Sequence, residues 1–184
     1  MKIVVLDRDG VINQDSDLYI KSADEWLPID GSIDAIAKLS QSGYKIAVAT
    51  NQSGLGRDLF DEYALAQIHH KLCSLVEDSG GIVDGIFYCP HLPDESCSCR
   101  KPATGLLTQI EQEFSTTLNQ SFFVGDSYKD VQAAISFGCK PVLVRTGKGL
   151  ATEQRLQQEG LSDVAVYDDL AAAAIQILAS EPGK

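Results

Sequence analysis

The chain has 184 residues, enough to bury one sizeable hydrophobic core, so its length favours a single domain. Its 44% hydrophobic and 22% charged residues are typical of a globular protein, and we expect it to fold throughout except at residues 181–184, a disordered tail. The net charge of −11 argues against nucleic acid or an anionic membrane as the main partner, because either would select a basic surface.

Hydrophobic patterning gives no sign of a membrane-spanning segment. Apolar runs fall short of the roughly 18 residues that cross a bilayer. The first run, Lys2–Leu6, leads directly into Asp7 and is too short for a signal peptide. We therefore predict a cytoplasmic protein, and we expect it to be a monomer.

Short runs rich in Val, Ile and Phe recur along the chain and indicate buried strands. They cover Ile3–Leu6, Lys45–Thr50, Gly85–Cys89, Ser121–Gly125, Pro141–Arg145 and Val164–Tyr167. Apolar residues at helical spacing lie between them, around 33–39, 65–76, 106–114, 131–137 and 170–178. Gly43, Gly80 and Gly138 follow three of these helices, where a left-handed residue is expected.

This alternation of strands and helices predicts an α/β fold. Its three layers are a Rossmann-like parallel sheet with helices on both faces. The intervals between strands hold no spare residues for a cap domain, so we predict one domain over residues 1–180. In such sheets ligands bind beyond the carboxyl ends of the strands.

Polar residues follow several of the strands at that edge. They are Asp7, Arg8 and Asp9 after the first, Thr50–Ser53 after the second, residues 89–101 after the third, and Asp126 with Asp130 after the fourth. Two carboxylates at positions i and i+2 are costly to place together unless a cation neutralises them. Each piece alone has a plain structural reading: an Asp-rich turn, a helix cap, or a solvated lysine at Lys101.

Taken in order, the pieces are far more specific than any one of them. Asp-x-Asp, then Thr50, then Lys101, then Gly-Asp126-x3-Asp130, each at the end of a separate strand, resembles the haloacid dehalogenase (HAD) superfamily from Met1 to about Thr146. Members that remove halogen lack the second Asp, so its presence favours phosphoryl transfer.

The resemblance implies a role for each catalytic residue. Asp7 would attack phosphorus and form an aspartyl phosphate, and Asp9 would protonate the leaving alcohol and then deprotonate water. Thr50 and Lys101 would hold the phosphoryl oxygens, and Arg100 completes the predicted catalytic set.

The resemblance also implies a catalytic Mg²⁺ ion. Its ligands would be Asp7, the backbone carbonyl of Asp9, and Asp126. Asp130 would support Lys101 or the waters on the metal.

A second constellation follows the third predicted strand. Cys89, His91, Cys97 and Cys99 offer three thiolates and one imidazole within eleven residues, which suits tetrahedral, structural Zn²⁺. The alternative is a run of buried cysteines, which a loop containing proline and acidic residues makes less favourable. Outside this segment, Cys73 and Cys139 are read as core thiols, and His69 and His70 are placed on the helix after Thr50 without a role.

The segment Cys89–Cys99 leads directly into Arg100 and Lys101. Together with the motifs Asp7–Gly10 and Asn51–Gly54, this resembles the capless HAD subgroup of heptose bisphosphatases and histidinol-phosphate phosphatases. The resemblance implies one set of substrate-binding residues: Asp7, Arg8, Asp9, Asp15, Ser16, Asp17, Leu18, Thr50, Asn51, Gln52, Ser53, Arg100 and Lys101.

Three functions stand at this point. The first is a phosphatase for the C7 phosphate of heptose 1,7-bisphosphate, in the synthesis of nucleotide-activated heptose for lipopolysaccharide; the second is a histidinol-phosphate phosphatase. Arg100 favours the first, because a guanidinium would bind a distal phosphate and repel the cationic histidinol. The short spacing between His91 and Cys97 leans towards the second. The third function is an inactive, zinc-stabilised binding protein.

Overall fold

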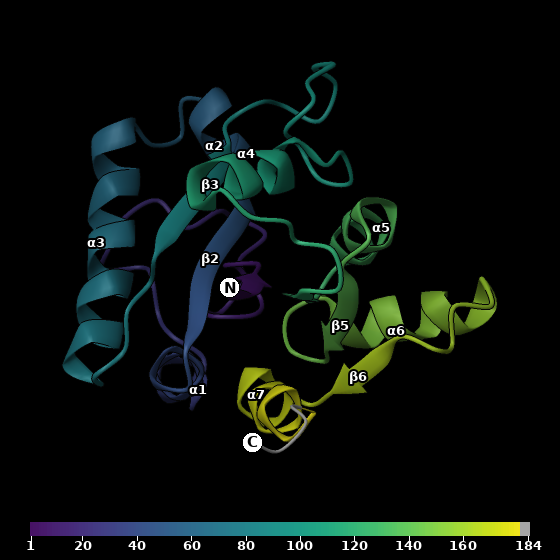
Figure 1. The fold of residues 1–184 in the computed structure, drawn as a ribbon. Helices are drawn as coiled ribbons and strands as arrows, with labels where there is room; N and C mark the ends of the chain where they lie inside the picture. Colours follow the sequence, from purple (N-terminus) through teal and green to yellow (C-terminus); the bar gives the residue numbers. More distant parts are fainter. Residues whose placement is uncertain (181–184) are drawn as a thin grey trace.

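The computed structural model describes residues 1–180; the tail expected to be disordered, 181–184, lies outside the described residues. Six parallel strands form one sheet in the order β3-β2-β1-β4-β5-β6 (Figure 1). The strands are β1 Lys2–Leu6, β2 Tyr44–Asn51, β3 Gly85–Cys89, β4 Phe122–Gly125, β5 Lys140–Val144 and β6 Ala165–Tyr167. The helices are α1 Ser32–Gln41, α2 Ser53–Gly56, α3 Glu62–Asp78, α4 Gly105–Phe114, α5 Tyr128–Phe137, α6 Gly149–Gln158 and α7 Leu170–Ala179.

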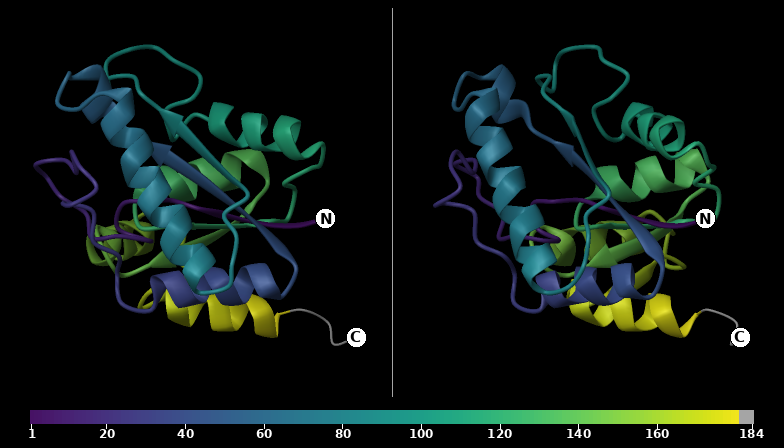
Figure 2. Two further views of the ribbon diagram at one scale, coloured as in Figure 1. Left: turned by 90° about the vertical axis from the view of Figure 1, so that its left-hand side faces the viewer. Right: turned by 60° about the vertical axis from the view of Figure 1, so that its left-hand side comes forward.

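The sheet buries both of its faces, and the side chains of β1 show how. Val4 and Leu6 point into a core shared with α1, α3 and α7, whereas Ile3 and Val5 point into a core shared with α4 and α5. In both views of Figure 2, α1 and α7 lie side by side on the same face. Both faces of a parallel sheet must be covered in this way, which is why its strands are nearly continuous hydrophobic runs. The predicted three-layer α/β fold is confirmed.

Helix ends follow the sequence signals. Gly43, Gly80 and Gly138 all have φ between 82° and 87°, the left-handed conformation expected of a residue after a helix. Asp61 caps α3 by accepting a hydrogen bond from the backbone N–H of Ala64. Helix α5 begins with a capping box in which Ser127 and Asp130 bond to each other's backbone N–H.

Two helices lie outside the predicted set, and both carry weak hydrophobic patterns. Helix α2 is a single turn of four residues. Helix α6 buries only Gly149, Thr152 and Leu156, because it covers the outer part of the sheet near β5. Its polar composition hides the 3.6-residue periodicity on which sequence reasoning depends.

Strands β1, β2 and β4 bring their carboxyl ends together, since Leu6 is in register with Val48 and Val124. No separate cap covers that edge in the described part of the chain (Figure 1). None of the helices within residues 1–180 combines the length and apolar composition that crossing a membrane requires.

Candidate active site

A cavity of about 460 Å³ opens at the carboxyl ends of the strands. It is lined by residues that follow β1, β2 and β4, by the loop after β3, by the first turn of α5, and by the start and middle of α6. The predicted site residues on its wall are Asp7, Asp9, Asp15, Ser16, Asp17, Thr50, Asn51, Gln52, Ser53, Arg100, Lys101, Asp126 and Asp130.

Three carboxylates gather around one lysine at the base of this cavity. Lys101 is 2% exposed, and its Nζ lies 2.9 Å from Asp7 Oδ1 and 2.6 Å from Asp130 Oδ1. It also donates to the backbone carbonyl of Ala49, at 2.7 Å. Asp7, Asp126 and Asp130 each place a carboxylate oxygen within 4.8 Å of the others.

One lysine does not compensate three buried carboxylates, and the pKa values show the imbalance. Burial, followed by repulsion from Asp130, raises the pKa of Asp7 well above its usual range, although Lys101 opposes this. Burial and Asp130 likewise raise the pKa of Asp126 to about 7. A divalent cation with oxygen ligands would relieve this repulsion, so the residues present fit the predicted Mg²⁺.

Two glycines make room for the carboxylate of Asp126. A Cβ atom at Gly10 or Gly147 would lie 2.1 Å from Asp126 Oδ2, and both glycines have positive φ. The same oxygen accepts a hydrogen bond from the backbone N–H of Lys148, at 2.8 Å. Asp126 is therefore held in one orientation, as a metal ligand requires.

Asp9 lies beside this cluster but has a different environment. Its carboxylate accepts hydrogen bonds from Asn13 Nδ2, at 2.9 Å, and from Gln52 Nε2, at 2.8 Å, and it pairs with the guanidinium of Arg8. Burial acts to raise the pKa of Asp9, but Arg8 and the two amide donors outweigh it, and the pKa is lowered. The neighbouring carboxylates Asp7 and Asp9 thus have pKa values shifted in opposite directions, as is common where they have different roles.

The structure places two residues of the predicted substrate-binding set away from the cavity wall. The guanidinium of Arg8 is buried and turned towards Asp9 and His69. Leu18 is 78% exposed and points to solvent, while the next two residues of its loop, Tyr19 and Ile20, line the cavity instead.

The end of β2 holds in place the residues predicted to bind the phosphoryl group. Thr50 is 1% exposed, and its hydroxyl accepts a hydrogen bond from Gln52 Nε2 at 2.8 Å. The side-chain amide of Asn51 binds the backbone of Lys101 twice: it donates to the carbonyl at 3.1 Å and accepts from the N–H at 3.0 Å. These two hydrogen bonds join Lys101, which follows the loop of residues 89–99 (the cysteine loop), to the end of β2.

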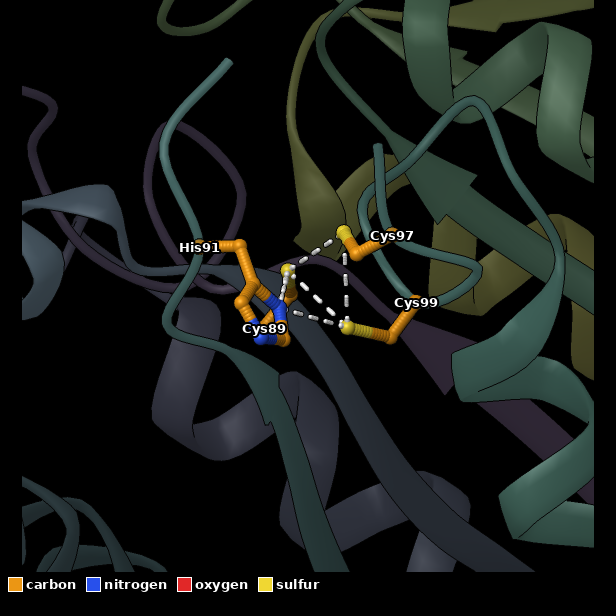
Figure 3. A group of neighbouring side chains, drawn as sticks. All are labelled: Cys89, His91, Cys97 and Cys99. Atoms are coloured by element: carbon orange, nitrogen blue, oxygen red, sulfur yellow. Dashed lines mark hydrogen bonds between the residues drawn. The ribbon is translucent and has the colours of Figure 1, made fainter. Parts of the chain in front are cut away.

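The cysteine loop brings its four candidate ligands together (Figure 3). The Sγ atoms of Cys89, Cys97 and Cys99 lie 3.1 to 3.8 Å apart, and His91 Nδ1 lies 3.5 Å from Cys89 Sγ and 3.2 Å from Cys99 Sγ. Ligands about 2.3 Å from a tetrahedral zinc ion would be separated by roughly 3.7 Å. All three thiols are free, so the donor set fits zinc in a closed, structural site.

Sequence reasoning missed the part of the cavity wall formed by α5 and α6, here called the far wall, which is rich in cations. Lys129 on α5, Lys148 before α6 and Arg155 on α6 line it together with Arg100. Burial lowers the pKa of Lys129, and so do the charges of Arg100 and Lys148, which shows that these cations lie near one another. Lys148 Nζ pairs with Asp15 Oδ2 at 3.1 Å. These cations gather positive charge on one part of the cavity wall, although the net charge of the chain is −11.

Comparison with known proteins agrees with the fold. The HAD-hydrolase-like family model matches residues 98–173. The D-glycero-β-D-manno-heptose-1,7-bisphosphate 7-phosphatase of Pseudomonas putida is 49% identical over 97% of this chain and 100% of the relative, and that of Pseudomonas aeruginosa is 51% identical over 96% and 97%.

Among solved structures, the D,D-heptose 1,7-bisphosphate phosphatase of Bordetella bronchiseptica, complexed with magnesium and phosphate, matches with a TM-score of 0.92 and 48% identity. The match covers 98% of this chain and 100% of that one. Nearly complete coverage at this identity is decisive, and the chain belongs to the D-glycero-β-D-manno-heptose-1,7-bisphosphate 7-phosphatase family of HAD hydrolases.

Proposed function

We propose that this protein hydrolyses the C7 phosphate of D-glycero-β-D-manno-heptose 1,7-bisphosphate and releases heptose 1-phosphate, a step in the synthesis of nucleotide-activated heptose for lipopolysaccharide. The observation that carries the proposal is the buried group of Asp7, Asp126 and Asp130 around Lys101 at the end of the sheet. The names of the relatives supply the substrate and its β anomer. We place the reaction in the cytoplasm and assign it to a monomer.

The first step is transfer of the phosphoryl group to Asp7. A carboxylate oxygen of Asp7 attacks phosphorus, the bond from phosphorus to the sugar O7 breaks, and O7 takes a proton from Asp9. Lys101 and Thr50 bind the phosphoryl oxygens and stabilise their charge in the transition state. A bound phosphate dianion would raise the lowered pKa of Asp9 through repulsion, which favours its protonated form.

The second step regenerates Asp7. Asp9, now a carboxylate, takes a proton from water, and the water oxygen attacks phosphorus while the bond to Asp7 breaks. Inorganic phosphate leaves. Mg²⁺ held by Asp7, the backbone carbonyl of Asp9 and Asp126 would shield the attacking carboxylate from the charge of the phosphate.

The cations of the far wall provide a place for the phosphate that is not hydrolysed. Arg100 lines the cavity, and its Nη1 donates to the backbone carbonyl of His91 at 3.2 Å, which fixes the guanidinium against the cysteine loop. Zinc in that loop would hold Arg100 and Lys101 in position. Histidinol phosphate, which carries an amine and an imidazole, would meet Arg100, Lys129 and Lys148 with charges of the same sign.

A panel of phosphate-release assays tests this proposal. Purified protein with Mg²⁺ is supplied with the α and β anomers of heptose 1,7-bisphosphate and with histidinol phosphate. We expect the highest kcat/KM with the β anomer. A higher value with histidinol phosphate would overturn the substrate.

A further inference from the structure

Arg8 is the most deeply buried arginine among the described residues near the active site. Its side chain is 1% exposed. Such a charge is costly to bury unless every part of it has a partner. Two of its nitrogens form hydrogen bonds with Asp9. Nε donates to Oδ1 at 3.1 Å, and Nη2 donates to Oδ1 at 3.0 Å and to Oδ2 at 3.1 Å.

The other end of the guanidinium contacts His69, which lies 61 positions away on α3. Arg8 Nη1 and His69 Nε2 are 3.3 Å apart. Arginine has donors only, so Nε2 must be the acceptor, and the proton of a neutral imidazole then resides on Nδ1. Burial and the neighbouring charge of Arg8 lower the pKa of His69 to about 4, which agrees with a neutral ring at pH 7.

The imidazole of His69 is itself held in place. It packs against the ring of Tyr88 on β3, with ring centroids 6.0 Å apart at an angle of 56°. Helix α3 and strand β3 therefore fix His69, which contacts Arg8, which contacts Asp9. By contrast, His70, the next residue on α3, is exposed.

We propose that His69 and Arg8 are positioning residues for the proton-transfer step: His69 fixes the guanidinium of Arg8, and Arg8 holds the carboxylate of Asp9 facing the oxygen of the leaving alcohol. The proposal rests on the proposed function, in which Asp9 protonates that oxygen. Asn13 and Gln52 also bind Asp9, but each contributes a single hydrogen bond. Among the described residues, Arg8 is the single side chain that contacts both carboxylate oxygens, and it therefore limits the rotation of the group.

The test varies the leaving group. It thereby distinguishes a loss of proton donation from a general loss of active-site structure. His69→Leu removes the acceptor, His69→Gln offers an amide oxygen in its place, and His70→Leu is the matched control on the same helix. Each is assayed with the heptose bisphosphate, whose alcohol needs a proton, and with 4-nitrophenyl phosphate, whose phenolate leaves without one. The parameter is kcat/KM, which covers the steps up to loss of the leaving group and excludes dephosphorylation of Asp7.

For His69→Leu we expect kcat/KM with the sugar bisphosphate to fall roughly tenfold to a hundredfold, since displacement of a catalytic group by about 1 Å costs on this order. The loss with 4-nitrophenyl phosphate should stay below about threefold, because that leaving group needs no general acid. His69→Gln should recover part of the loss, and His70→Leu should match the unsubstituted protein. Equal losses on both substrates, or no loss on either, would overturn the proposal.

A spectroscopic measurement decides the geometry without relying on turnover. In protein labelled with ¹⁵N and ¹³C, Nε2 of His69 should resonate as an unprotonated, accepting nitrogen at pH 7, and the Asp9 carboxyl resonance should shift in His69→Leu but not in His70→Leu. A protonated Nε2, or an Asp9 resonance unchanged in His69→Leu, would refute the positioning role. Failure of the unsubstituted protein to hydrolyse either phosphate would instead refute the proposed function.

Discussion

The carboxylate cluster at the end of β1 and the thiol cluster at the end of β3 lie at the same edge of the sheet, yet they are built for different purposes. Asp7, Asp126 and Asp130 line an open cavity together with Lys101, which pairs with Asp7 and Asp130, so their charges face the cavity. Cys89 and its partners close on one another in a loop, and none of the four lines the cavity. A metal in the first cluster would take part in chemistry, whereas a metal in the second would hold the loop that carries Arg100 and Lys101.

The largest expected effect comes from neutralising the first cluster. Asp7→Asn should lower kcat by more than about a hundredfold, because an amide cannot form the phospho-enzyme. The fold should remain, since the substitution also removes one of the mutually repelling carboxylates. The measurements are phosphate release and thermal unfolding, and an Asn variant that kept more than about a hundredth of the activity would rule out Asp7 as the nucleophile.

Disrupting the second cluster should give the opposite pattern. Cys97→Ser should release zinc, detected by elemental analysis, and should lower the free energy of unfolding by on the order of 4 kcal/mol, as expected for loss of a structural metal. Activity should fall only because the loop bearing Arg100 becomes disordered. Cys73→Ser, which changes a half-buried thiol on α3 outside the cluster, is the control and should keep its zinc.

Removal of Mg²⁺ compares the two clusters in one protein. Exchange into buffer without Mg²⁺ should stop turnover, and added Mg²⁺ should restore it while the zinc content stays unchanged. The assignment of the thiol cluster as a structural zinc site would be wrong if the purified protein contained no zinc and were fully stable.

A smaller effect is expected where the two clusters meet, at Arg100. Arg100→Ala should reduce kcat/KM for the bisphosphate roughly tenfold to a hundredfold, because a charge-assisted hydrogen bond contributes about 1.5 to 3 kcal/mol. A sugar monophosphate without the distal group should be affected little. Lys38→Ala, an exposed cation on α1, serves as the control. Equal losses on both substrates would show that Arg100 binds the reacting phosphate.

The last expected effect is on stability as the pH changes, and it concerns His69. Its pKa is about 4 in the folded protein and about 6.5 in the unfolded chain. Between these values the unfolded chain binds more protons, so stability should rise as pH increases from 4 to 6.5 and should be fully present above 6.5. The contribution is at most about 3 kcal/mol. Urea unfolding of His69→Gln should show a flatter profile over this window, and an unchanged slope would contradict the assigned pKa.

Sequence reasoning located the strands and the edge where the site lies, because parallel strands leave hydrophobic runs that end in polar residues. It missed Lys148 and Arg155, since α6 has too few buried residues to reveal its face. It also placed the Arg8 side chain against the substrate. Motif position specifies the backbone of a turn, but the direction of a side chain depends on partners such as His69, which only tertiary structure brings near.

The ion pair between Lys148 and Asp15 has a consequence for how the cavity opens. Lys148 has one ammonium group, and in the free protein that group joins the loop of Asp15 to the start of α6. A phosphate arriving at the far wall would compete with Asp15 for it, so binding would exchange an internal ion pair for an external one. The segment of Asp15 would then lose this contact with the start of α6 as the ligand enters, so the mouth of the cavity would respond to the charge of its occupant.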